Sequence, residues 1–285
     1  MLPPYITDEF LEHFIKTALA EDIGEGDHSA LGSIPETATS RARLLIKDSG
    51  ILGGVLLAQK IFRLFDKDLD IEIFKNDGAE VSKGDVAFSV AGSARSILTT
   101  ERLVLNCMQR MSGIATKTHH LATIIAGTHA KLLDTRKTTP NFRLIEKWAV
   151  VLGGGYNHRI GLFDMIMLKD NHIDMAGGIE QAINRTKDYL RAVNRSLKIE
   201  IETRNLGEVK QVMSVGGVDV IMLDNMSPKE MKVAVDLIGG KFLTEASGNI
   251  TEETIRSVAE SGVDYISVGA LTHSVKSLDL SLKAY

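Results

Sequence analysis

The sequence predicts an α/β protein, and two observations in its second half carry that prediction. Short apolar runs alternate with longer segments of helical spacing from Lys131 onward, which is typical of a parallel sheet with helical crossovers. Several of these runs end abruptly in ionisable residues, as strands do where they open into a binding site. We therefore expect a parallel α/β barrel, atypical because its span is shorter than the roughly 250 residues of the usual eightfold form.

The stretch from Lys131 to His172 shows this pattern most clearly. Leu132–Leu133 and Met165–Leu168 are predicted strands. The helix between them is expected to have Thr139 as its N-cap and Pro140 as its first residue, and to end before three consecutive glycines. The unit is therefore strand, helix, strand, with a cluster of cations after the strands that suits an anionic ligand.

The alternation of strand and helix repeats through the rest of the second half. Strands are expected at 198–203, 218–223, 241–244 and 265–268, and helices at 178–193, 206–215, 228–237 and 251–261. Glu200 and Glu202 project from one face of the first of these strands. Carboxylates inside a barrel are costly unless they bind a ligand, an ion partner or water, so these two residues are candidates for a site.

The first part of the chain has a different pattern. A helix is expected at 8–20, and strand-like pieces at 40–47, 50–55 and 69–74 precede short strands joined by Asp-Gly and Lys-Gly turns. A helix at 99–112 follows, whose polar residues we interpret as a solvated face: Glu101, Arg102, Asn106 and Arg110. We expect residues 1–114 to form one domain, joined by the tail 275–285, and residues 115–274 to form the barrel domain.

Composition excludes several classes of partner. A net charge of −4 and an aromatic content of 5% argue against nucleic acid, because neither a basic field nor a set of stacking residues is present. The single cysteine, Cys107, excludes an intrachain disulfide. No apolar run approaches the roughly 18 residues of a membrane helix, and the first residues lack a cationic segment followed by an apolar one. We expect a cytoplasmic protein.

Two glycine loops near the end of the chain suggest where a phosphate would bind. Ser247-Gly248-Asn249 precedes a predicted helix start, and Gly269-Ala270 follows the last predicted strand. Glycine permits close backbone approach, and free N–H groups at a helix start attract phosphate oxygens. The loops after the last two strands of a barrel are its frequent phosphate site. With the basic residues of the earlier strand ends opposite them, these loops favour a phosphorylated substrate.

These motifs carry a resemblance to a known family. LLDTRKT, GGGYNHRIGLFDMIMLKDNH, IEIET, MLDN, EASGNI and SVGALTHS, with EDIGEGD and TTERLVLN earlier, resemble quinolinate phosphoribosyltransferase over nearly the whole chain. Asn141 stands where many members have glycine, and DHS replaces a more usual Asp-Xaa-Thr. The resemblance implies an N-terminal α+β open sandwich, a seven-stranded α/β barrel and a homodimer in which one subunit covers its partner's barrel mouth. It leaves open a trimer of dimers.

The resemblance also implies a reaction and a set of site residues. Quinolinate and phosphoribosyl pyrophosphate would give nicotinate mononucleotide, pyrophosphate and CO2 with Mg²⁺, in NAD biosynthesis. Arg136, Lys137, His158 and Arg159 would bind the two carboxylates with Thr135 nearby, joined by Arg102 of the partner. Lys169 would reach phosphate or pyrophosphate, and Glu202 and Asp224 would bind ribose hydroxyls or Mg²⁺. Ser247, Gly248, Asn249, Val268, Gly269 and Ala270 would hold the 5′-phosphate. The catalytic residues would be Lys137, Lys169, Glu202 and Asp224.

Three other functions remain open at this point. A barrel lyase could use Lys169 or Lys137 as a Schiff base, although four or more neighbouring cations exceed what a carbonyl substrate needs. A molybdate-transport-associated relative of the pyrophosphorylases shares much of the pattern, but loss of the dicarboxylate cations would mark it, and they are present. A catalytically inactive protein that binds the phosphoribosyl ligand is the third.

Overall fold

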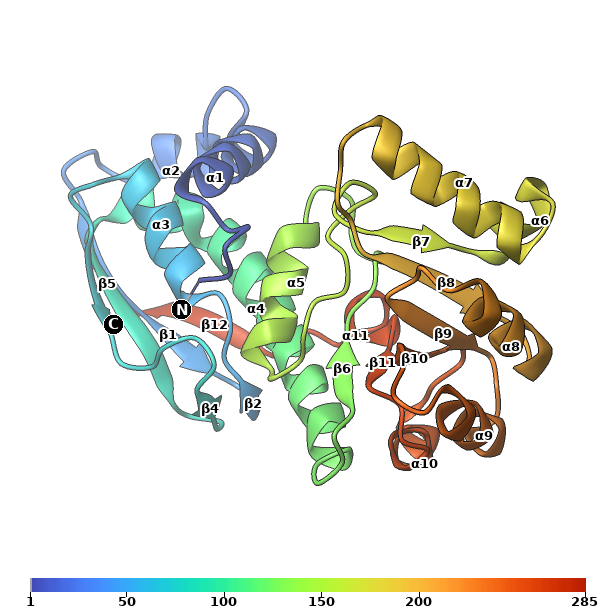
Figure 1. The fold of residues 1–285 in the computed structure, drawn as a ribbon. Coiled ribbons are helices and arrows are strands. Elements are labelled where there is room, and N and C mark those ends of the chain that lie inside the picture. Colours follow the sequence, from blue (N-terminus) through green and yellow to red (C-terminus); the bar gives the residue numbers. More distant parts are fainter. Residues whose placement is uncertain (1) are drawn as a thin grey trace. The chain divides into compact units, whose positions relative to one another are not determined.

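The computed structural model describes residues 2–285 and divides into two compact units (Figure 1). Unit 1 takes the described residues up to 119 together with 139–154 and 271–285, and unit 2 takes 120–138 and 155–270. The segment 139–154, which the sequence placed within the barrel domain, therefore lies with the first unit. No helix within residues 2–285 combines the length and the apolar character that crossing a membrane requires.

Unit 1 is built on a four-stranded antiparallel sheet with the order β12-β1-β5-β3. Its strands are β1 (Thr39–Ile46), β3 (Asp70–Ile73), β5 (Val86–Ser93) and β12 (Leu280–Ala284), and β2 (Gly50–Ile51) pairs separately with β4 (Glu80–Val81). Strand β12 comes from the C-terminal tail and forms one edge of the sheet. The end of the chain thus completes a sheet that its beginning starts.

The helices of unit 1 include one long element and several short ones. They are α1 (Asp8–Ile23), α2 (His28–Ser33), α3 (Val55–Phe65), most of α4 (Ala94–Ile124), α5 (Arg143–Leu152) and most of α11 (Ala270–His273). The predicted strand at 50–55 is wrong beyond Ile51, because a helix begins at Val55. The carboxylate of Asp77 accepts hydrogen bonds from the amides of Val55 and Leu56 at 2.8 and 3.1 Å. A distant side chain therefore starts α3, which local spacing did not reveal.

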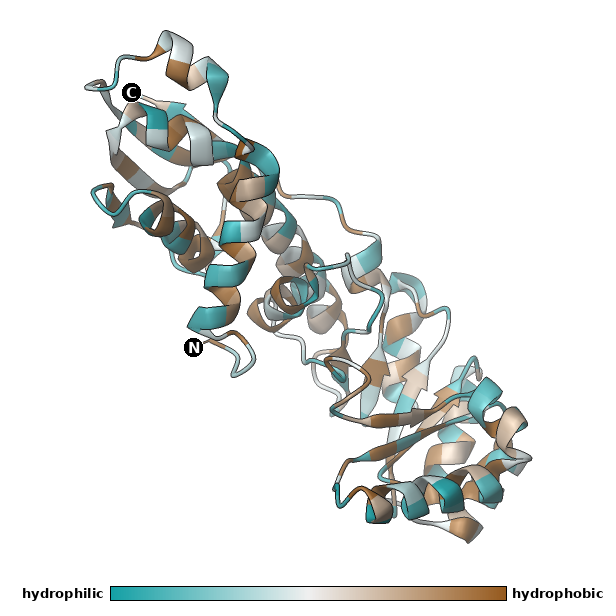
Figure 2. Ribbon diagram, turned by 90° about the horizontal axis from the view of Figure 1, so that it is seen from above, coloured by the Kyte–Doolittle hydropathy of each residue, from teal (hydrophilic) through white to brown (hydrophobic). Residues whose placement is uncertain are grey.

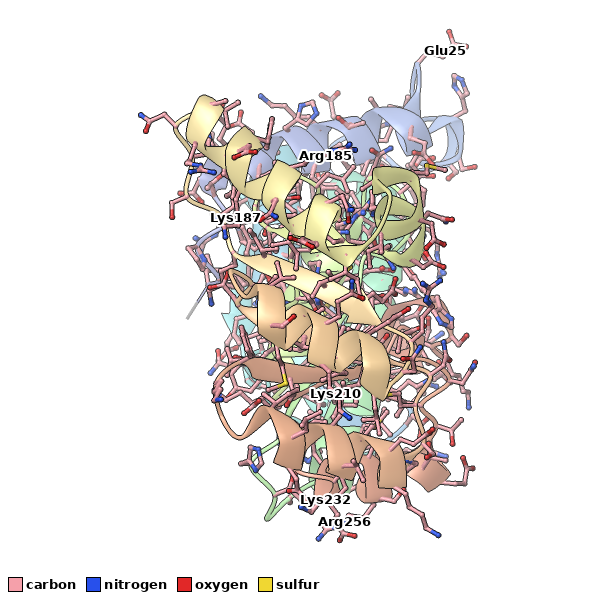
Figure 3. All side chains as sticks on the ribbon, turned by 45° about the vertical axis from the view of Figure 1, so that its right-hand side comes forward. Glu25, Arg185, Lys187, Lys210, Lys232 and Arg256 are labelled. Carbon is pink, nitrogen blue, oxygen red and sulfur yellow. The ribbon has the colours of Figure 1, made fainter. Side chains whose placement is uncertain are left out.

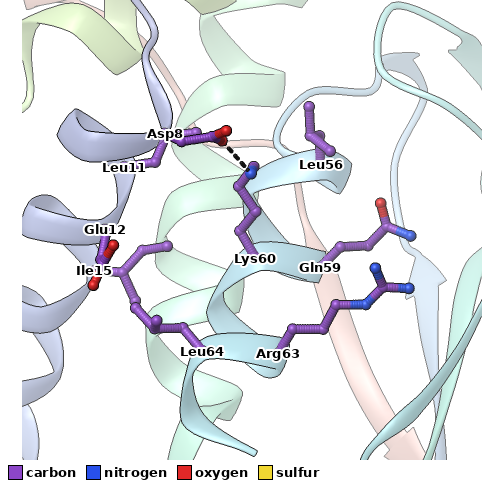
Figure 4. A pocket seen from close by; sticks show the side chains of 9 residues that line it. All are labelled: Asp8, Leu11, Glu12, Ile15, Leu56, Gln59, Lys60, Arg63 and Leu64. Carbon is purple, nitrogen blue, oxygen red and sulfur yellow. Dashed lines mark hydrogen bonds and ion pairs between the residues drawn. The ribbon is translucent and has the colours of Figure 1, made fainter. Parts of the chain in front are cut away.

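Helix α1 confirms the predicted amphipathic pattern. Leu11 and Ile15 are buried on its inner side, and α1 packs beside α3. A surface groove of about 360 Å³ remains between the two helices, and at its rim Nζ of Lys60 lies 2.6 Å from a carboxylate oxygen of Asp8 (Figure 4). Two amphipathic surface helices ordinarily bury apolar residues between them and expose charged residues to solvent, as this pair does.

Two expectations about charged and capping residues in unit 1 are corrected by one buried carboxylate. Arg110 does not belong to a solvated face, because its guanidinium donates to Glu146 at 3.0 and 2.8 Å. Thr139 is not the N-cap of α5, since α5 begins at Arg143 and Thr139 instead donates its amide and hydroxyl to Glu146 at 3.1 and 2.9 Å. Glu146 is fully buried, and a buried carboxylate requires such partners.

Unit 2 contains a parallel sheet, as predicted. The strand order is β6-β11-β10-β9-β8-β7, and every pairing is parallel. The strands are β6 (Lys131–Leu133), β7 (Ile166–Leu168), β8 (Ile199–Thr203), β9 (Val220–Asp224), β10 (Leu243–Ser247) and β11 (Tyr265–Ser267). Strand β10 runs three residues beyond its expected end at 244. This extension places Glu245 inside the strand.

The structure has six strands in this sheet, where the resemblance implied seven. A single parallel bridge between Leu133 and Tyr156 stands beside β6 in the place of a further strand. The residues after Tyr156 use a side chain for their hydrogen bonds, since the carboxylate of Asp134 accepts from the amide of His158 and the side chain of Asn157 at 2.9 and 2.6 Å. Asp134 therefore anchors this segment without extending the ladder.

Helices follow the strands of unit 2 in turn and lie on the outer side of the curved sheet (Figure 1). They are α6 (Asp170–Ala176), α7 (Ile179–Ala192), α8 (Leu206–Val215), α9 (Pro228–Ile238) and α10 (Glu252–Glu260). Helices α7 to α10 confirm the predicted ones, and α6 is additional. The strands are mostly apolar and the helices carry hydrophilic residues on their outer faces (Figure 2), the arrangement of a sheet covered by amphipathic helices.

Candidate active site

A pocket of about 180 Å³ opens at the carboxyl ends of the parallel strands of unit 2. The residues that line it are Thr135, Arg136, Lys137, His158, Arg159, Met167, Lys169, Met222, Glu245, Ser247 and Ser267. Seven of the site residues proposed from the sequence are therefore brought together from four separate stretches of the chain. This is the end of a parallel sheet at which α/β proteins bind their ligands.

The remaining predicted residues lie at neighbouring strand ends or in unit 1. Glu202 is in β8, Asp224 ends β9, and Gly248 with Asn249 follows β10. Val268, Gly269 and Ala270 follow β11. Arg102 belongs to α4 in unit 1, where its side chain is 64% exposed and lies 3.6 Å from the carboxylate of Glu101.

Two guanidinium groups share the pocket. Burial lowers the pKa of Arg159, and the positive charge of Arg136 lowers it further. Arg159 donates to the carbonyl of Met165 at 3.3 Å, and Nε of Arg136 is buried with no hydrogen-bond partner among the described residues. Placing like charges together and leaving a buried donor unsatisfied both cost stability. An anionic ligand with several acceptor oxygens would relieve both costs.

A second group, of opposite charge, lies at the ends of β8 and β9. Nζ of Lys169 is 3.4 Å from Glu202, whose other oxygen accepts the amide of Asp170 at 3.1 Å. Burial raises the pKa of Asp224, and the negative charge of Glu202 raises it further. Two neighbouring carboxylates at one edge of a pocket suit a cation or a set of hydroxyl donors.

The sequence made Glu200 a candidate for the site without a specific role and did not single out Glu245. Nε2 of His158 lies 3.0 Å from an oxygen of Glu200 and 3.3 Å from an oxygen of Glu245, and both glutamates are 1% exposed. His158 lines the pocket, but this ring nitrogen is directed at the two glutamates. The sequence signal for Glu200 was a charged residue within an otherwise apolar strand, which indicated that its carboxylate needs a partner.

The three side chains form a proton-sharing cluster under the pocket. Burial raises the pKa of Glu200 to about 7, and the charge of Glu245 adds to this effect while His158 opposes it. The three residues have ligand atoms within 4.8 Å of one another, a spacing that could also hold a metal ion. Nδ1 of His158, however, accepts the amide hydrogen of Arg159 at 2.6 Å, which places the ring proton on Nε2. Nε2 then faces the carboxylates of Glu200 and Glu245.

The raised pKa of Glu200 predicts a specific dependence of stability on pH. The folded protein holds this proton up to about pH 7, whereas the unfolded chain releases it near 4.5. The contribution is therefore complete below about 4.5 and is lost as pH rises through about 7, with a size of about 3 kcal/mol. Denaturant unfolding between pH 4.5 and 8 should show a steeper fall in stability with pH for the unmodified protein than for Glu200→Gln.

The exposed Glu180 on α7 supplies the matched control for this experiment. Glu180→Gln removes the same charge from the surface and should leave the slope unchanged. Parallel stability curves for the unmodified protein and Glu200→Gln would contradict the shared proton.

Comparisons with known proteins identify two family domains along the chain. Residues 18–112 match the family model described as quinolinate phosphoribosyl transferase, N-terminal domain, and residues 114–283 match the C-terminal domain of the same family. A chloroplastic nicotinate-nucleotide pyrophosphorylase [carboxylating] of Arabidopsis thaliana is 48% identical, with 99% of this chain and 84% of that protein covered.

Solved structures give the same result at the level of the fold. NadC from Streptococcus pyogenes has a TM-score of 0.92 at 40% identity, over 98% of this chain and 97% of that one. The nicotinate-nucleotide pyrophosphorylase from Francisella tularensis has a TM-score of 0.91 at 40% identity, over 98% of each chain. Two domain models that together span most of the sequence, and relatives that match it nearly end to end, place this chain in the quinolinate phosphoribosyltransferase family.

Proposed function

We propose that this protein transfers the phosphoribosyl group of phosphoribosyl pyrophosphate to quinolinate and releases CO2, a step of NAD biosynthesis. The products are nicotinate mononucleotide, pyrophosphate and CO2. The family membership supports this function, and the names of the relatives describe the same carboxylating pyrophosphorylase and decarboxylating transferase.

The observation that carries the proposal is the pair of guanidinium groups in the pocket. Quinolinate has carboxylates on adjacent ring carbons, and Arg136 with Arg159 offers two planar donors whose mutual repulsion such a dianion would cancel. Lys137 and Lys169 line the same pocket and supply further positive charge. Thr135 stays a predicted substrate contact, whereas both ring nitrogens of His158 already have partners within the protein.

The carboxylates of Glu202 and Asp224 fit a hydrated Mg²⁺ bound with the pyrophosphate. Oxygen ligands are those that Mg²⁺ prefers. Burial and then repulsion from Glu202 raise the pKa of Asp224, and a cation would relieve the repulsion. Mg²⁺ would neutralise charge on the departing pyrophosphate. Glu202 and Asp224 would themselves bind the ribose hydroxyls and stabilise positive charge at the anomeric carbon. Lys169, next to Glu202, would contact the departing group.

The phosphate end of the substrate is assigned to the two glycine loops. Ser247 lines the pocket, Gly248 has a left-handed backbone with φ of 95°, and Asn249 follows it. Val268, Gly269 and Ala270 would complete the phosphate site from the neighbouring strand end. Backbone N–H groups at such loops bind phosphate oxygens without needing a charged side chain.

Decarboxylation needs no further catalytic group. Once the ring nitrogen is glycosylated it is cationic and can accept the electron pair that remains on the adjacent carbon when CO2 leaves. That carbon then takes a proton from water. The protein's contribution is placement of the ring and electrostatic stabilisation by the cations around it.

The assembly and the compartment are finer proposals. We propose a homodimer in which Arg102 of one subunit completes the site of the other, with a trimer of dimers as the alternative assembly. The 64% exposure of the Arg102 side chain supports this, since it leaves the guanidinium accessible to a partner. The cytoplasm stays the predicted compartment, although the Arabidopsis relative is described as chloroplastic.

The test is turnover with phosphoribosyl pyrophosphate and Mg²⁺, comparing quinolinate with nicotinate while CO2 and nicotinate mononucleotide are measured. We expect both products with quinolinate and neither with nicotinate. Turnover with nicotinate alone, and not with quinolinate, would refute the carboxylating assignment. Borohydride trapping with carbonyl substrates is the control, because a Schiff-base lyase would become covalently labelled at Lys169 or Lys137 and a phosphoribosyltransferase would not.

A further inference from the structure

Asn225 connects the ends of two neighbouring strands of the parallel sheet. It follows Asp224 at the end of β9, and its amide donates to the carbonyl of Ser247 at the end of β10 at 2.9 Å. Its side-chain nitrogen donates to the carboxylate of Asp224 at 2.7 Å, and its side-chain oxygen accepts from Asn249 at 3.1 Å. One residue thus contacts both the carboxylate at one strand end and the glycine loop at the next.

The backbone at this position is shaped for that connection. Asn225 has φ of 54°, in the left-handed region that asparagine tolerates better than most residues. Gly248 makes room for it, because a Cβ at 248 would lie 2.2 Å from the side-chain oxygen of Asn225. The glycine of the loop and the asparagine of the strand end therefore depend on each other.

We propose that Asn225 is a positioning residue that fixes the distance between Asp224 and the 247–249 loop, so that the ribose and the 5′-phosphate of one substrate are held together. This rests on the proposed function, in which Asp224 serves the ribose or its metal and the loop serves the phosphate. An amide is suited to the task because it donates to a carboxylate with one end and accepts an N–H with the other. Neither aspartate nor leucine could do both.

Asn225→Gly is the informative variant, since glycine keeps the left-handed backbone and removes only the amide. Ribose 5-phosphate is the probe, because it contains both groups that Asn225 is proposed to align. We expect Asn225→Gly to raise its Kd, and the KM for phosphoribosyl pyrophosphate, about tenfold through loss of two hydrogen bonds. The Kd for quinolinate should change less than twofold. Asn225→Asp should be worse than Asn225→Gly, because a second carboxylate would face Asp224.

Asn194→Gly is the matched control. Asn194 also has a left-handed backbone, with φ of 49°, but it is exposed at the end of α7. Asn194→Gly should leave the Kd values for ribose 5-phosphate and quinolinate and the KM for phosphoribosyl pyrophosphate unchanged. If Asn225 had only a structural role, Asn225→Gly would have a lower unfolding midpoint, and its Kd values for ribose 5-phosphate and quinolinate would change to the same extent.

The outcomes distinguish this inference from the proposed function. Equal losses for ribose 5-phosphate and quinolinate, or no loss for either, would overturn the positioning role. An unmodified protein that binds ribose 5-phosphate but shows no turnover with quinolinate would overturn the proposed function. The Kd values of Asn225→Gly and Asn194→Gly for ribose 5-phosphate, measured by titration calorimetry, would still decide the role of Asn225.

Discussion

Arg159→Ala should lower kcat/KM for quinolinate by ten- to a hundredfold while the protein stays folded. The variant loses one charge-assisted contact to a substrate carboxylate, which corresponds to about 1.5–3 kcal/mol. Its unfolding midpoint should be equal to or higher than that of the unmodified protein, because Arg159 lies beside the like charge of Arg136. Steady-state kinetics and thermal unfolding measure the two effects. Lys137→Ala should show a loss of activity of the same size.

Cations on the outer helices provide matched controls for both variants. Arg185 on α7 and Lys210 on α8 are exposed cations of the same unit (Figure 3). Arg185→Ala and Lys210→Ala remove the same charges from the surface and should retain unmodified kinetics. Normal kcat/KM for quinolinate in Arg159→Ala, or its failure to fold, would show that the assigned role is wrong.

Arg102→Ala and Lys137→Ala should each lose activity alone, by about ten- to a hundredfold, and should recover activity when their subunits are mixed. In a twofold dimer each site would combine Lys137 of one subunit with Arg102 of its partner. Random reassortment makes about half of the dimers mixed, and each mixed dimer has one intact and one doubly altered site. About a quarter of all sites should therefore recover.

Subunit exchange must be demonstrated for this result to be decisive. A pull-down with differently tagged subunits shows whether mixed dimers have formed. If they form and activity stays at the level of the separate variants, Arg102 does not complete its partner's site. The solvated charged face first expected for this part of α4 would then describe Arg102, although it does not describe Arg110.

The sequence by itself determined the class of the second unit and the location of its pocket. Strand and helix alternation from Lys131 onward depends on local periodicity, which the amino-acid order records directly. The strand ends then place Arg136, Lys169 and Ser247 at one edge of a parallel sheet, because all such strands point the same way. That reasoning needed no distances, and the pocket lined by these residues agrees with it.

Only the tertiary structure decided how buried charges are partnered. Glu146 binds Thr139 and Arg110, which are 7 and 36 residues away in the chain. Because Thr139 binds Glu146, it does not cap α5, and the helix begins at Arg143 instead of the predicted Pro140. Glu200 and Glu245 meet His158 from two different strands. Local spacing shows that such a charge must find a partner but does not identify it, because the partner's approach depends on how distant strands and helices pack.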